Sequence, residues 1–418
     1  MSSAVLGQRP DRIIIVGGGA AAFFGAIACA SANPRAQITL LEAAPRVLGK
    51  VRISGGGRCN LTHHCFDPAL LVQHYPRGGK ELRGAFNRFQ PRDTMQWFQE
   101  RGVALKTEAD GRVFPVSDDS STIVDCLVAE AKALGVRIRT QAAVKRIANV
   151  AGEFQVMTSQ APEPLVADRL LLATGSSPQG YRLAAQLGHT IVRPVPSLFT
   201  FQVADPRLHE RAGLSVHPVR ATLKVADQPP LTQEGALLIT HWGFSGPVVL
   251  KLSAWGARSL ASHHYQATLT INWLPLVSYD NLRSRLEACR VRLPKRAIAS
   301  HCPFDLPRRL WSYWLELVGI PVDQTWAHLA KKSSQQLALL LHCSEFAIVG
   351  KGVFKEEFVT CGGVDLKDVD FKTMASRRCP GLFLAGELLD IDGVTGGFNL
   401  QSAWTTGWIA GQSLGRNG

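Results

Sequence analysis

Short runs of aliphatic and β-branched residues recur near both ends of the chain. Such fully apolar runs are typical of parallel strands that are buried on both faces. A longer segment, 121–134, instead has apolar residues at helical spacing, after a cap at Ser120 or Ser121 and before Gly135. Strands that alternate with helices predict an α/β domain built on a parallel sheet. We assign its strands to 13–16, 38–41, 136–140, the region around Val144, 170–173 and 382–385.

The middle of the chain has a different pattern. Residues 194–273 contain short β-type runs broken by Pro and Gly, which predicts a β-rich segment. Residues 281–340 look helical, and the strand pattern of the first domain returns afterwards. The pattern therefore predicts a Rossmann-like domain formed by both chain ends around an insertion, without internal repeats or a low-complexity linker.

One uncharged run, 13–30, is long enough to resemble a secretory signal or a membrane span. Three consecutive glycines at 17–19 weaken that interpretation, because glycine destabilises a helix interior by about 1 kcal/mol relative to alanine. The run divides more naturally into a strand, a tight turn and a helix. We therefore expect a cytoplasmic protein that does not bind a membrane.

Length, net charge and cysteine spacing indicate which classes of protein the chain can belong to. The chain has 418 residues, with 46 Lys plus Arg against 33 Asp plus Glu, so its formal net charge is +13. This length suits two or three domains, and the charge favours an acidic partner such as nucleic acid or a membrane surface. The nine cysteines include no Cys-x-x-Cys pair, which argues against a zinc ribbon, an iron–sulfur cluster and a thioredoxin-type centre. A reducing cytosol is the expected compartment.

The first strand leads into a Gly17-x-Gly19-x-x-Ala22 turn and then a helix. This order is the fingerprint of dinucleotide binding: a tight turn, close approach of a pyrophosphate, and close packing of helix on strand. Glu42 follows the second strand, 25 residues after Gly17, where its carboxylate can accept from both ribose hydroxyls. That acid disfavours a 2′-phosphate, so the sequence predicts FAD or NAD and not NADP.

Two later strand ends favour FAD. One strand ends in Ala173-Thr174-Gly175, and another ends in Gly386-Glu387, where an acid can lie beside a ribityl chain. A glycine-rich segment then precedes a helix whose free amides can stabilise the anionic reduced flavin. A glycine-rich turn that only caps the last helix is the alternative. The residues of this predicted helix start are Gly396, Gly397, Phe398, Asn399 and Leu400.

Three motifs resemble the BaiN-like family of FAD-dependent flavoproteins, which includes a ribosomal-RNA dihydrouridine synthase. They are 53–60 (ISGGGRCN), 240–247 (THWGFSGP) and the segment from AGE at 385–387 to GGFNLQ at 396–401. The resemblance implies a flavin-dependent redox enzyme whose substrate is a ribosomal uridine, a bile acid or a small amino ketone. Trp242 and Ala22 depart from the usual family residues, and Trp242 can reshape the substrate side.

The resemblance also implies a nested architecture. We expect a FAD-binding domain at 1–193 and 350–418, a β-rich domain at 194–275 and 341–349, and a basic helical insert at 276–340. Further contacts to FAD are expected from Lys50, Gly56, Arg58, Asn60 and the backbone of Val144.

Candidate chemistry lies in two of these motifs. The glycines before Arg58 form a nest-like loop that permits close approach to a flat ring, and Arg58 can pair with a pyrophosphate or an anionic substrate. Cys59 can donate a proton near the flavin or simply pack in the core. His241, on a loop, is either a mobile acid–base group or a structural histidine.

A metal ion and a nicotinamide nucleotide are the other ligands to consider. His63, His64 and Cys65 have no partner cluster, so we predict no metal site. No second dinucleotide fingerprint exists, so either NAD(P)H docks transiently as the electron donor or dioxygen reoxidises the flavin.

The helical insert is strongly basic. Residues 281–340 contain ten Lys or Arg against four acids, with Trp311, Tyr313, Trp314 and Trp326 interleaved. Cations on phosphates with aromatic rings under bases are typical of RNA binding, although a solvated basic face over an aromatic core gives the same pattern. We therefore favour reduction of a uridine in structured RNA, with small-molecule turnover or a non-catalytic flavoprotein as alternatives. The expected RNA contacts are Arg283, Arg292, Lys295, Arg296, Arg308 and Arg309.

Overall fold

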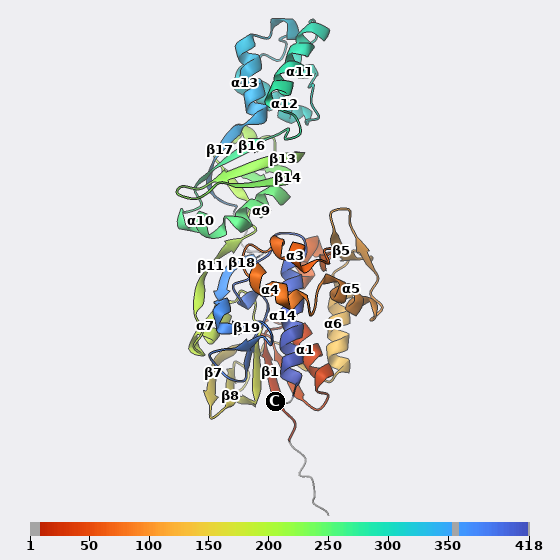
Figure 1. Cartoon of the computed structure of the whole chain (residues 1–418), viewed down its shortest axis with the longest axis vertical. Helices are drawn as coiled ribbons and strands as arrows, with labels where there is room; N and C mark the ends of the chain where they lie inside the picture. Colours follow the sequence, from red (N-terminus) through yellow and green to blue (C-terminus); the bar gives the residue numbers. More distant parts are fainter. Residues whose placement is uncertain (1–8, 353–358, 417–418) are drawn as a thin grey trace, which may run out of the picture. The chain divides into compact units, whose positions relative to one another are not determined.

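The computed structural model describes residues 9–352 and 359–416 of the chain (Figure 1). It divides into two compact units, and each is described by itself. Unit 1 comprises the chain up to Pro194 and from Val359 onward, so both chain ends build it. Unit 2 is the intervening segment, Val195–Phe358.

Unit 1 is organised around a parallel sheet with the strand order β21-β10-β1-β2-β6, to which β20 and β19 add antiparallel at the β21 edge. The central strand β1 is buried because Ile13, Ile14 and Ile15 are covered on both faces. The predicted α/β sheet is confirmed. Its strands are β1 (Arg12–Val16), β2 (Gln37–Leu41), β6 (Arg137–Arg139), β10 (Arg169–Leu172), β19 (Val369–Asp370), β20 (Ala375–Ser376) and β21 (Leu382–Leu384).

Two helices from opposite ends of the chain, α1 (Ala20–Ala32) and α14 (Phe398–Gly415), pack directly on each other (Figure 1). Small residues make this approach possible. A Cβ added to Gly407 would lie 2.4 Å from the Ala21 carbonyl oxygen, and one added to Gly411 would lie 2.3 Å from that of Gly25. The run 13–30 is therefore a strand, a turn and a buried helix.

The remaining helices and smaller sheets of unit 1 surround this core. The strand at Val144 belongs to a separate antiparallel sheet, β7-β8-β9, and not to the parallel sheet as predicted, because it pairs with the strand that follows it. A third sheet has the order β3-β5-β4, and β11 pairs with β18.

The helices of this group are α2 (Gly49–Ile53), α3 (Pro68–Leu71), α4 (Gly79–Phe86), α5 (Pro91–Gln99), α6 (Ser121–Ala133) and α7 (Pro178–Gln186). The strands are β3 (Thr62–His63), β4 (Leu105–Thr107), β5 (Arg112–Pro115), β7 (Val144–Val150), β8 (Glu153–Thr158), β9 (Leu165–Ala167), β11 (Ile191–Ser197) and β18 (Val359–Val364).

Unit 2 contains a closed barrel with the strand order β12-β15-β14-β13-β16-β17. The helices α11, α12 and α13 enter between β16 and β17 and share one hydrophobic core with the barrel. The barrel strands are β12 (Phe201–Val203), β13 (Ser215–Lys224), β14 (Leu231–Thr240), β15 (Gly243–Ser245), β16 (Ala267–Asn272) and β17 (Ser344–Lys351). The helices are α8 (Pro206–His209), α9 (Pro247–Trp255), α10 (Ala257–Ser262), α11 (Tyr279–Arg292), α12 (Arg308–Val318) and α13 (Lys331–His342).

The aromatic residues of the insert form this core and are not a stacking surface. Trp311, Tyr313, Trp314 and Trp326 are all fully buried, and Trp314 packs edge-on against Trp273 with ring centroids 5.3 Å apart. The suggestion that these rings lie under RNA bases is therefore wrong, because burying them is what joins the helices to the barrel. Within the described ranges, no helix is both long and apolar enough to cross a bilayer.

Candidate functional site

The first predicted ligand contact lies where β1 ends. Gly17 has φ +113°, and a Cβ there would lie 2.3 Å from the Ala173 carbonyl oxygen, so only glycine fits between the two strand ends. Gly19 caps α1 with extended backbone, and a Cβ on it would meet no atom within 4 Å. The start of α1 therefore presents free backbone amides to open space, as a pyrophosphate requires.

Glu42 directly follows β2 and faces this turn. Its Oε1 accepts from the amide of Ala44 at 2.7 Å, while a Cβ on Gly18 would lie 2.6 Å from its Oε2. The carboxylate is thus held at the carboxyl edge of the sheet, next to the glycine turn, where a ribose would lie.

Lys50, on α2, contacts residues that follow two neighbouring strands, β10 and β21. Its Nζ donates to Glu387 Oε2 at 2.5 Å and to Ser176 Oγ at 2.9 Å, and Glu387 Oε1 accepts from the amide of Thr360 at 3.1 Å. A Cβ on Gly175, which has φ +59°, would lie 3.8 Å from Glu387 Oε2. Three predicted residues, Lys50, Gly175 and Glu387, are thus brought together.

Thr174 and Gly386 complete this edge. The hydroxyl of Thr174 is buried, and no described group hydrogen-bonds to it. Gly386 has φ +74°, and its amide donates to Thr406 Oγ1 of α14 at 2.9 Å. A Cβ on Gly386 would lie 2.7 Å from the Cβ of Ala21, so this glycine lets the β21 end approach α1.

The glycine-rich loop at 55–57 adopts the unusual backbone angles that the sequence suggests. Gly55, Gly56 and Gly57 all have positive φ, and a Cβ on Gly56 or Gly57 would meet nothing within 4 Å. Arg58 does not present a free charge here. Its guanidinium lies 2.7 Å from Glu108 and 3.4 Å from Asp118 and stacks 4.0 Å above the Phe114 ring.

Cys59 is fully buried behind this loop. Burial raises the pKa of its thiol to about 12, and a hydrogen bond with Ser54 only partly opposes that shift. The thiol therefore keeps its proton at neutral pH but has no exposed surface from which to donate it.

Asn60 connects the glycine loop to the start of α14. With its amide oriented to satisfy both neighbours, it accepts from the amide of Gly397 at 3.0 Å and donates to the Thr62 carbonyl at 3.2 Å. Gly397 has φ +91°, and a Cβ there would lie 2.5 Å from the same carbonyl oxygen. Asn60 thus fixes the turn from which α14 begins.

The first turn of α14 is held by its own side chains. Phe398 stacks on His74 with ring centroids 4.2 Å apart, and its carbonyl accepts from Tyr75 Oη at 2.7 Å. Asn399 Oδ1 accepts from the amide of Gly393, and its Nδ2 donates to the Gly393 carbonyl, both at 2.8 Å. Leu400 is half-buried in the same turn. Gly396 has φ +135° and precedes this start.

Val144 begins β7, and its carbonyl accepts from Gln179 Nε2 at 3.1 Å. That carbonyl is therefore engaged by α7. A role for the Val144 backbone in adenine binding stays a prediction.

Sequence reasoning missed the polar groups that anchor the segment before α14. Asp392 is fully buried and receives a hydrogen bond from Arg77 Nε at 2.5 Å. Gln401 is also buried and accepts from Thr62 Oγ1 at 2.5 Å and Thr94 Oγ1 at 3.0 Å. The signal was a carboxylate and an amide within an apolar stretch, which require buried partners.

These residues fit FAD on structural grounds. Open space lies over Gly19, an acid faces the glycine turn, and the Thr174 hydroxyl is buried without a partner. The turn lies at β1, between β2 and β10, where connections leave the sheet in opposite directions. Dinucleotides bind at such switch points, beyond the carboxyl ends of parallel strands.

His241 belongs to unit 2, in the turn between β14 and β15, and is exposed. Its neighbour Trp242 is half-buried, and its indole Nε1 donates to Thr200 Oγ1 at 3.2 Å. The indole of Trp242 is thus held by Thr200, while a catalytic role for His241 stays a prediction.

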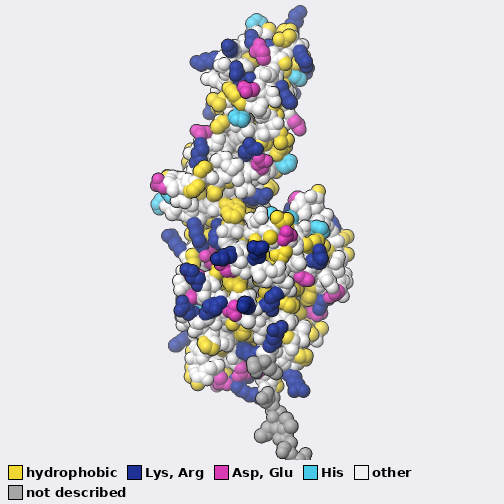
Figure 2. All heavy atoms as spheres, viewed as in Figure 1, with side chains coloured by type: hydrophobic (Ala, Val, Ile, Leu, Met, Phe, Trp, Pro, Cys, Tyr) yellow, Lys and Arg dark blue, Asp and Glu magenta, His cyan; other side chains and the backbone are white. Residues whose placement is uncertain are grey.

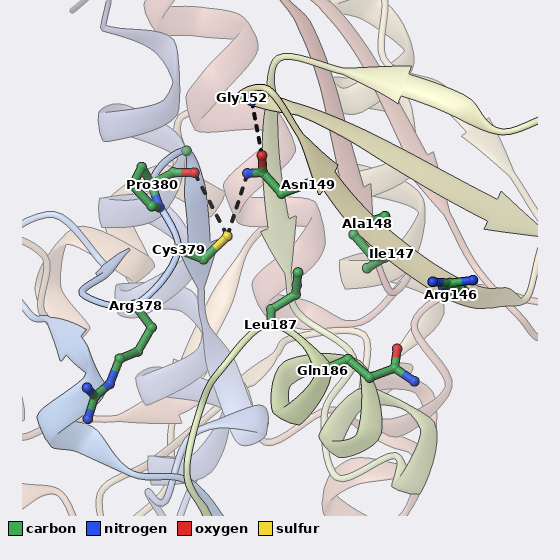
Figure 3. Close-up of a pocket in the computed structure, with 11 residues that line it drawn as sticks. Arg146, Ile147, Ala148, Asn149, Gly152, Gln186, Leu187, Arg378, Cys379 and Pro380 are labelled. Carbon is green, nitrogen blue, oxygen red and sulfur yellow. Dashed lines mark hydrogen bonds between the residues drawn. The ribbon is translucent and has the colours of Figure 1, made fainter.

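A separate open cavity of about 1030 Å³ lies at the amino ends of the strands (Figure 3). It is lined from β7, the end of α7 and the segment before β21, with Asn149 donating to Cys379 Sγ at 3.7 Å. Because the strands are parallel, this cavity is at the opposite edge of the sheet from the glycine turn, and we do not assign it to the cofactor. Among the described residues, no group of three or more His, Cys, Asp or Glu could hold a metal ion.

A family model and two similar proteins each match nearly the whole chain. The family model described as HI0933-like protein Rossmann domain matches residues 11–413. The chain is 30% identical to the 3-dehydro-bile acid delta(4,6)-reductase of Clostridium scindens, over 96% of this chain and 98% of that protein. It is also 30% identical to the ribosomal RNA dihydrouridine synthase of Escherichia coli, over 97% and 98%.

A solved structure has a similar fold. The 3-ketosteroid-delta4-(5alpha)-dehydrogenase of Rhodococcus jostii aligns with a TM-score of 0.51 at 16% identity, covering 100% of this chain and 99% of that chain. At this identity the likeness shows the fold alone.

Proposed function

The chain belongs to the HI0933-like Rossmann-domain family, and from this membership we propose that it reduces a uridine of structured, ribosomal RNA. The resemblance to the BaiN-like flavoproteins is confirmed, and the chain is an FAD-dependent oxidoreductase. The substrate is the part of this statement that we infer.

The two similar proteins have names that describe related chemistry. One is a reductase of a bile acid with double bonds at positions 4 and 6, and the other makes dihydrouridine, which has two more hydrogens than uridine. In both substrates the double bond is conjugated to a carbonyl. A hydride therefore adds to one carbon and a proton to its neighbour, and this reaction class is what we transfer to the chain.

FAD, when bound, supplies the hydride. The residues of unit 1 are suited to hold it: the start of α1 at Gly19 for the pyrophosphate, Glu42 for a ribose, and Glu387 with Lys50 for the ribityl chain. Free amides at the start of α14, after Gly397, suit the negative charge of the reduced ring. We propose NAD(P)H as the electron donor. It would dock only transiently, since the described strands offer no second dinucleotide turn.

One observation supports RNA over a small molecule: the cations of the helical insert are exposed. Nine of the ten Lys or Arg in 281–340 are exposed, and the tenth, Arg290, pairs with Glu287 at 3.0 Å. With four acids in the same segment, a net charge of +6 is left in 60 residues. Phosphate contacts of this kind provide a large share of the affinity of nucleic-acid-binding proteins. The proposed contacts are Arg283, Arg292, Lys295, Arg296, Arg308 and Arg309.

The proton must come from a group that reaches the base. We propose His241 for this role from its sequence motif at 240–247, because the other candidate, Cys59, is fully buried. A His241→Gln variant should keep its FAD but lose roughly 100-fold or more in the rate of uridine reduction.

The decisive experiment deletes the gene in its host and maps dihydrouridine in ribosomal RNA by mass spectrometry. We expect one modification to disappear and to return with a plasmid-borne copy of the gene. A copy with Arg292, Lys295 and Arg296 all changed to Glu should restore it poorly, although the variant protein retains FAD. An unchanged modification map would contradict the proposal.

The similarity to a bile acid reductase favours a second candidate, reduction or oxidation of a small molecule. Its test uses purified enzyme with a steroid-like enone or a small amine, and follows flavin reoxidation or hydrogen peroxide. Turnover there, together with an unchanged RNA map, would establish the second candidate in place of the first.

A further inference from the structure

We propose that unit 1 has its own RNA-docking surface beside the flavin site, formed by α4 and the turn between β19 and β20. It binds the phosphate backbone next to the base that is reduced, and it rests on the proposed function. We call it the α4 surface, and its members are Lys80, Arg83, Arg88 and Lys372.

The sequence around α4 is strongly basic. Residues 77–92 contain five cations against one acid, Glu81, and the next acid, Asp93, accepts from the amide of Gln90 at the start of α5. Leu82, Ala85 and Phe86 are the buried residues of α4. The helix is therefore amphipathic, with one face against the core and a cationic face outward.

The cationic face is aligned by helical geometry. Lys80 and Arg83 are three residues apart and so share one side of α4, and both are exposed. Arg88 donates to the backbone carbonyl of Lys372, which places the exposed Lys372 beside the end of the helix. Cations from segments far apart in sequence thus come together beside the end of α4.

No described carboxylate forms an ion pair with these four side chains. Two nearby acids are engaged elsewhere: Asp368 pairs with Arg378 at 2.7 Å, and Asp370 lies 3.6 Å from Arg377. The positive charge of the α4 surface is thus available to a partner. Figure 2 shows Lys and Arg side chains over the face of unit 1 that has α4 and β19 in Figure 1.

The surface begins at the segment that leads into the flavin-facing helix. A Cβ on Gly78, just before α4, would lie 2.5 Å from Ile391, and the amide of Val394 donates to the His74 carbonyl at 2.9 Å. The buried pair of Arg77 and Asp392 fixes the same junction. Because Gly396 and Gly397 follow directly, phosphates on α4 would lie next to a base held at the start of α14.

Polyanionic RNA is the partner that this charge pattern fits. A small enone has no phosphate groups that could bind cations outside the cofactor site. RNA has many, and each phosphate contact strengthens binding by releasing counterions. The α4 surface is a positioning device, because it holds the backbone and leaves the choice of base to the flavin site.

The test measures binding of the FAD-loaded enzyme to ribosomal RNA purified from the deletion strain, as a function of salt. The double variant Arg83→Glu, Lys372→Glu should weaken binding at least tenfold near physiological salt. It should also reduce the slope of log affinity against log salt by about two, at roughly 0.7 to 0.9 per phosphate contact. FAD absorbance and NAD(P)H-driven flavin reduction should not change.

The matched control reverses two exposed cations at the other edge of the sheet, Lys132→Glu and Arg137→Glu. It has the same change in net charge, and its binding slope should stay within about half a unit of the wild type. If glutamate disturbs folding, Arg83→Gln with Lys372→Gln removes the same contacts without new charge. An equal loss in the control would contradict a localised surface.

The outcomes separate this inference from the proposed function. Dihydrouridine that disappears on gene deletion and is fully restored by the Arg83, Lys372 variant would overturn the α4 surface and leave the function intact. A map that does not change on deletion would overturn the function, and the α4 surface with it.

Discussion

Lys50 Nζ lies 2.5 Å from Glu387 Oε2, and this ion pair joins residues that are 337 positions apart in the chain. Lys50 begins the segment that leads to the glycine loop at 55–57, and Glu387 follows the last parallel strand. The pair therefore connects α2, near the start of the chain, with the end of β21, near its other end, at the carboxyl edge of the sheet. It holds together the two distant segments of the proposed flavin site.

The first prediction concerns Glu42. Glu42→Gln keeps an oxygen for the Ala44 amide but removes the charge that would accept from the ribose hydroxyls. Hydrogen bonds to charged groups contribute about 1.5–3 kcal/mol, so FAD affinity should fall roughly 10- to 100-fold. Flavin fluorescence titration of the apoprotein measures this.

Glu163→Gln is the control, because Glu163 is exposed in the segment between β8 and β9. Equal FAD affinity in the two variants would mean that Glu42 does not bind the cofactor.

The second prediction tests the contact between α1 and α14. Gly411→Ala would place a Cβ 2.3 Å from the Gly25 carbonyl oxygen, so the helices must separate. Overpacking of this kind destabilises by about 1–3 kcal/mol. Gly84→Ala in α4 is the control, since its Cβ would meet nothing within 4 Å and alanine favours a helix by about 0.5–1 kcal/mol.

Urea denaturation of both proteins should therefore give midpoints on opposite sides of the wild type. A Gly411→Ala midpoint at or above that of the wild type would show that the helices are not in the close contact described.

Sequence reasoning located most of unit 1 because its signals are local. The turn at Gly17, the acid at Glu42 and the glycines at 396–397 each mark a strand end or a helix start within a few residues. What the sequence could not predict was which distant groups meet. The pairing of Lys50 with Glu387, and of Arg58 with Glu108, depends on sheet order, and no short-range pattern encodes it.

The errors have the same origin. The pattern around Val144 predicts a strand of the parallel sheet, because an apolar residue looks alike in a parallel strand and in a hairpin. Trp311 and Trp314 resemble base-stacking groups because they are interleaved with cations, and an aromatic core under a basic face gives the same pattern. In the structure these rings point inward, because they share one core with Trp273 and Phe346 of the barrel.

The third prediction concerns acid stability. Hydrogen bonds with Arg12 lower the pKa of Asp168 below its ordinary value of 3.8. Since the folded pKa is below the unfolded one, the interaction stabilises the fold fully above about pH 4. That contribution is lost as the pH falls through the unfolded value toward the folded one.

Asp168→Asn should therefore lower the stability at pH 7 and flatten its decline below pH 4, as followed by thermal melts across the pH range. A variant whose melting temperature declines in parallel with that of the wild type from pH 5 to pH 2 would assign the acid sensitivity to other carboxylates.

The last prediction decides between packing and catalysis at Cys59. A fully buried thiol with a pKa near 12 is a packing residue in the geometry described, so Cys59→Ala should leave the rate of substrate reduction within about twofold of the wild type. Loss of the sulfur should lower stability by about 1 kcal/mol, because a small cavity remains. Single-turnover reduction by the FAD-loaded enzyme and a denaturation curve measure the two effects separately. A proton donor would behave in the opposite way: its removal would slow reduction about 100-fold or more while FAD content and stability stayed near those of the wild type.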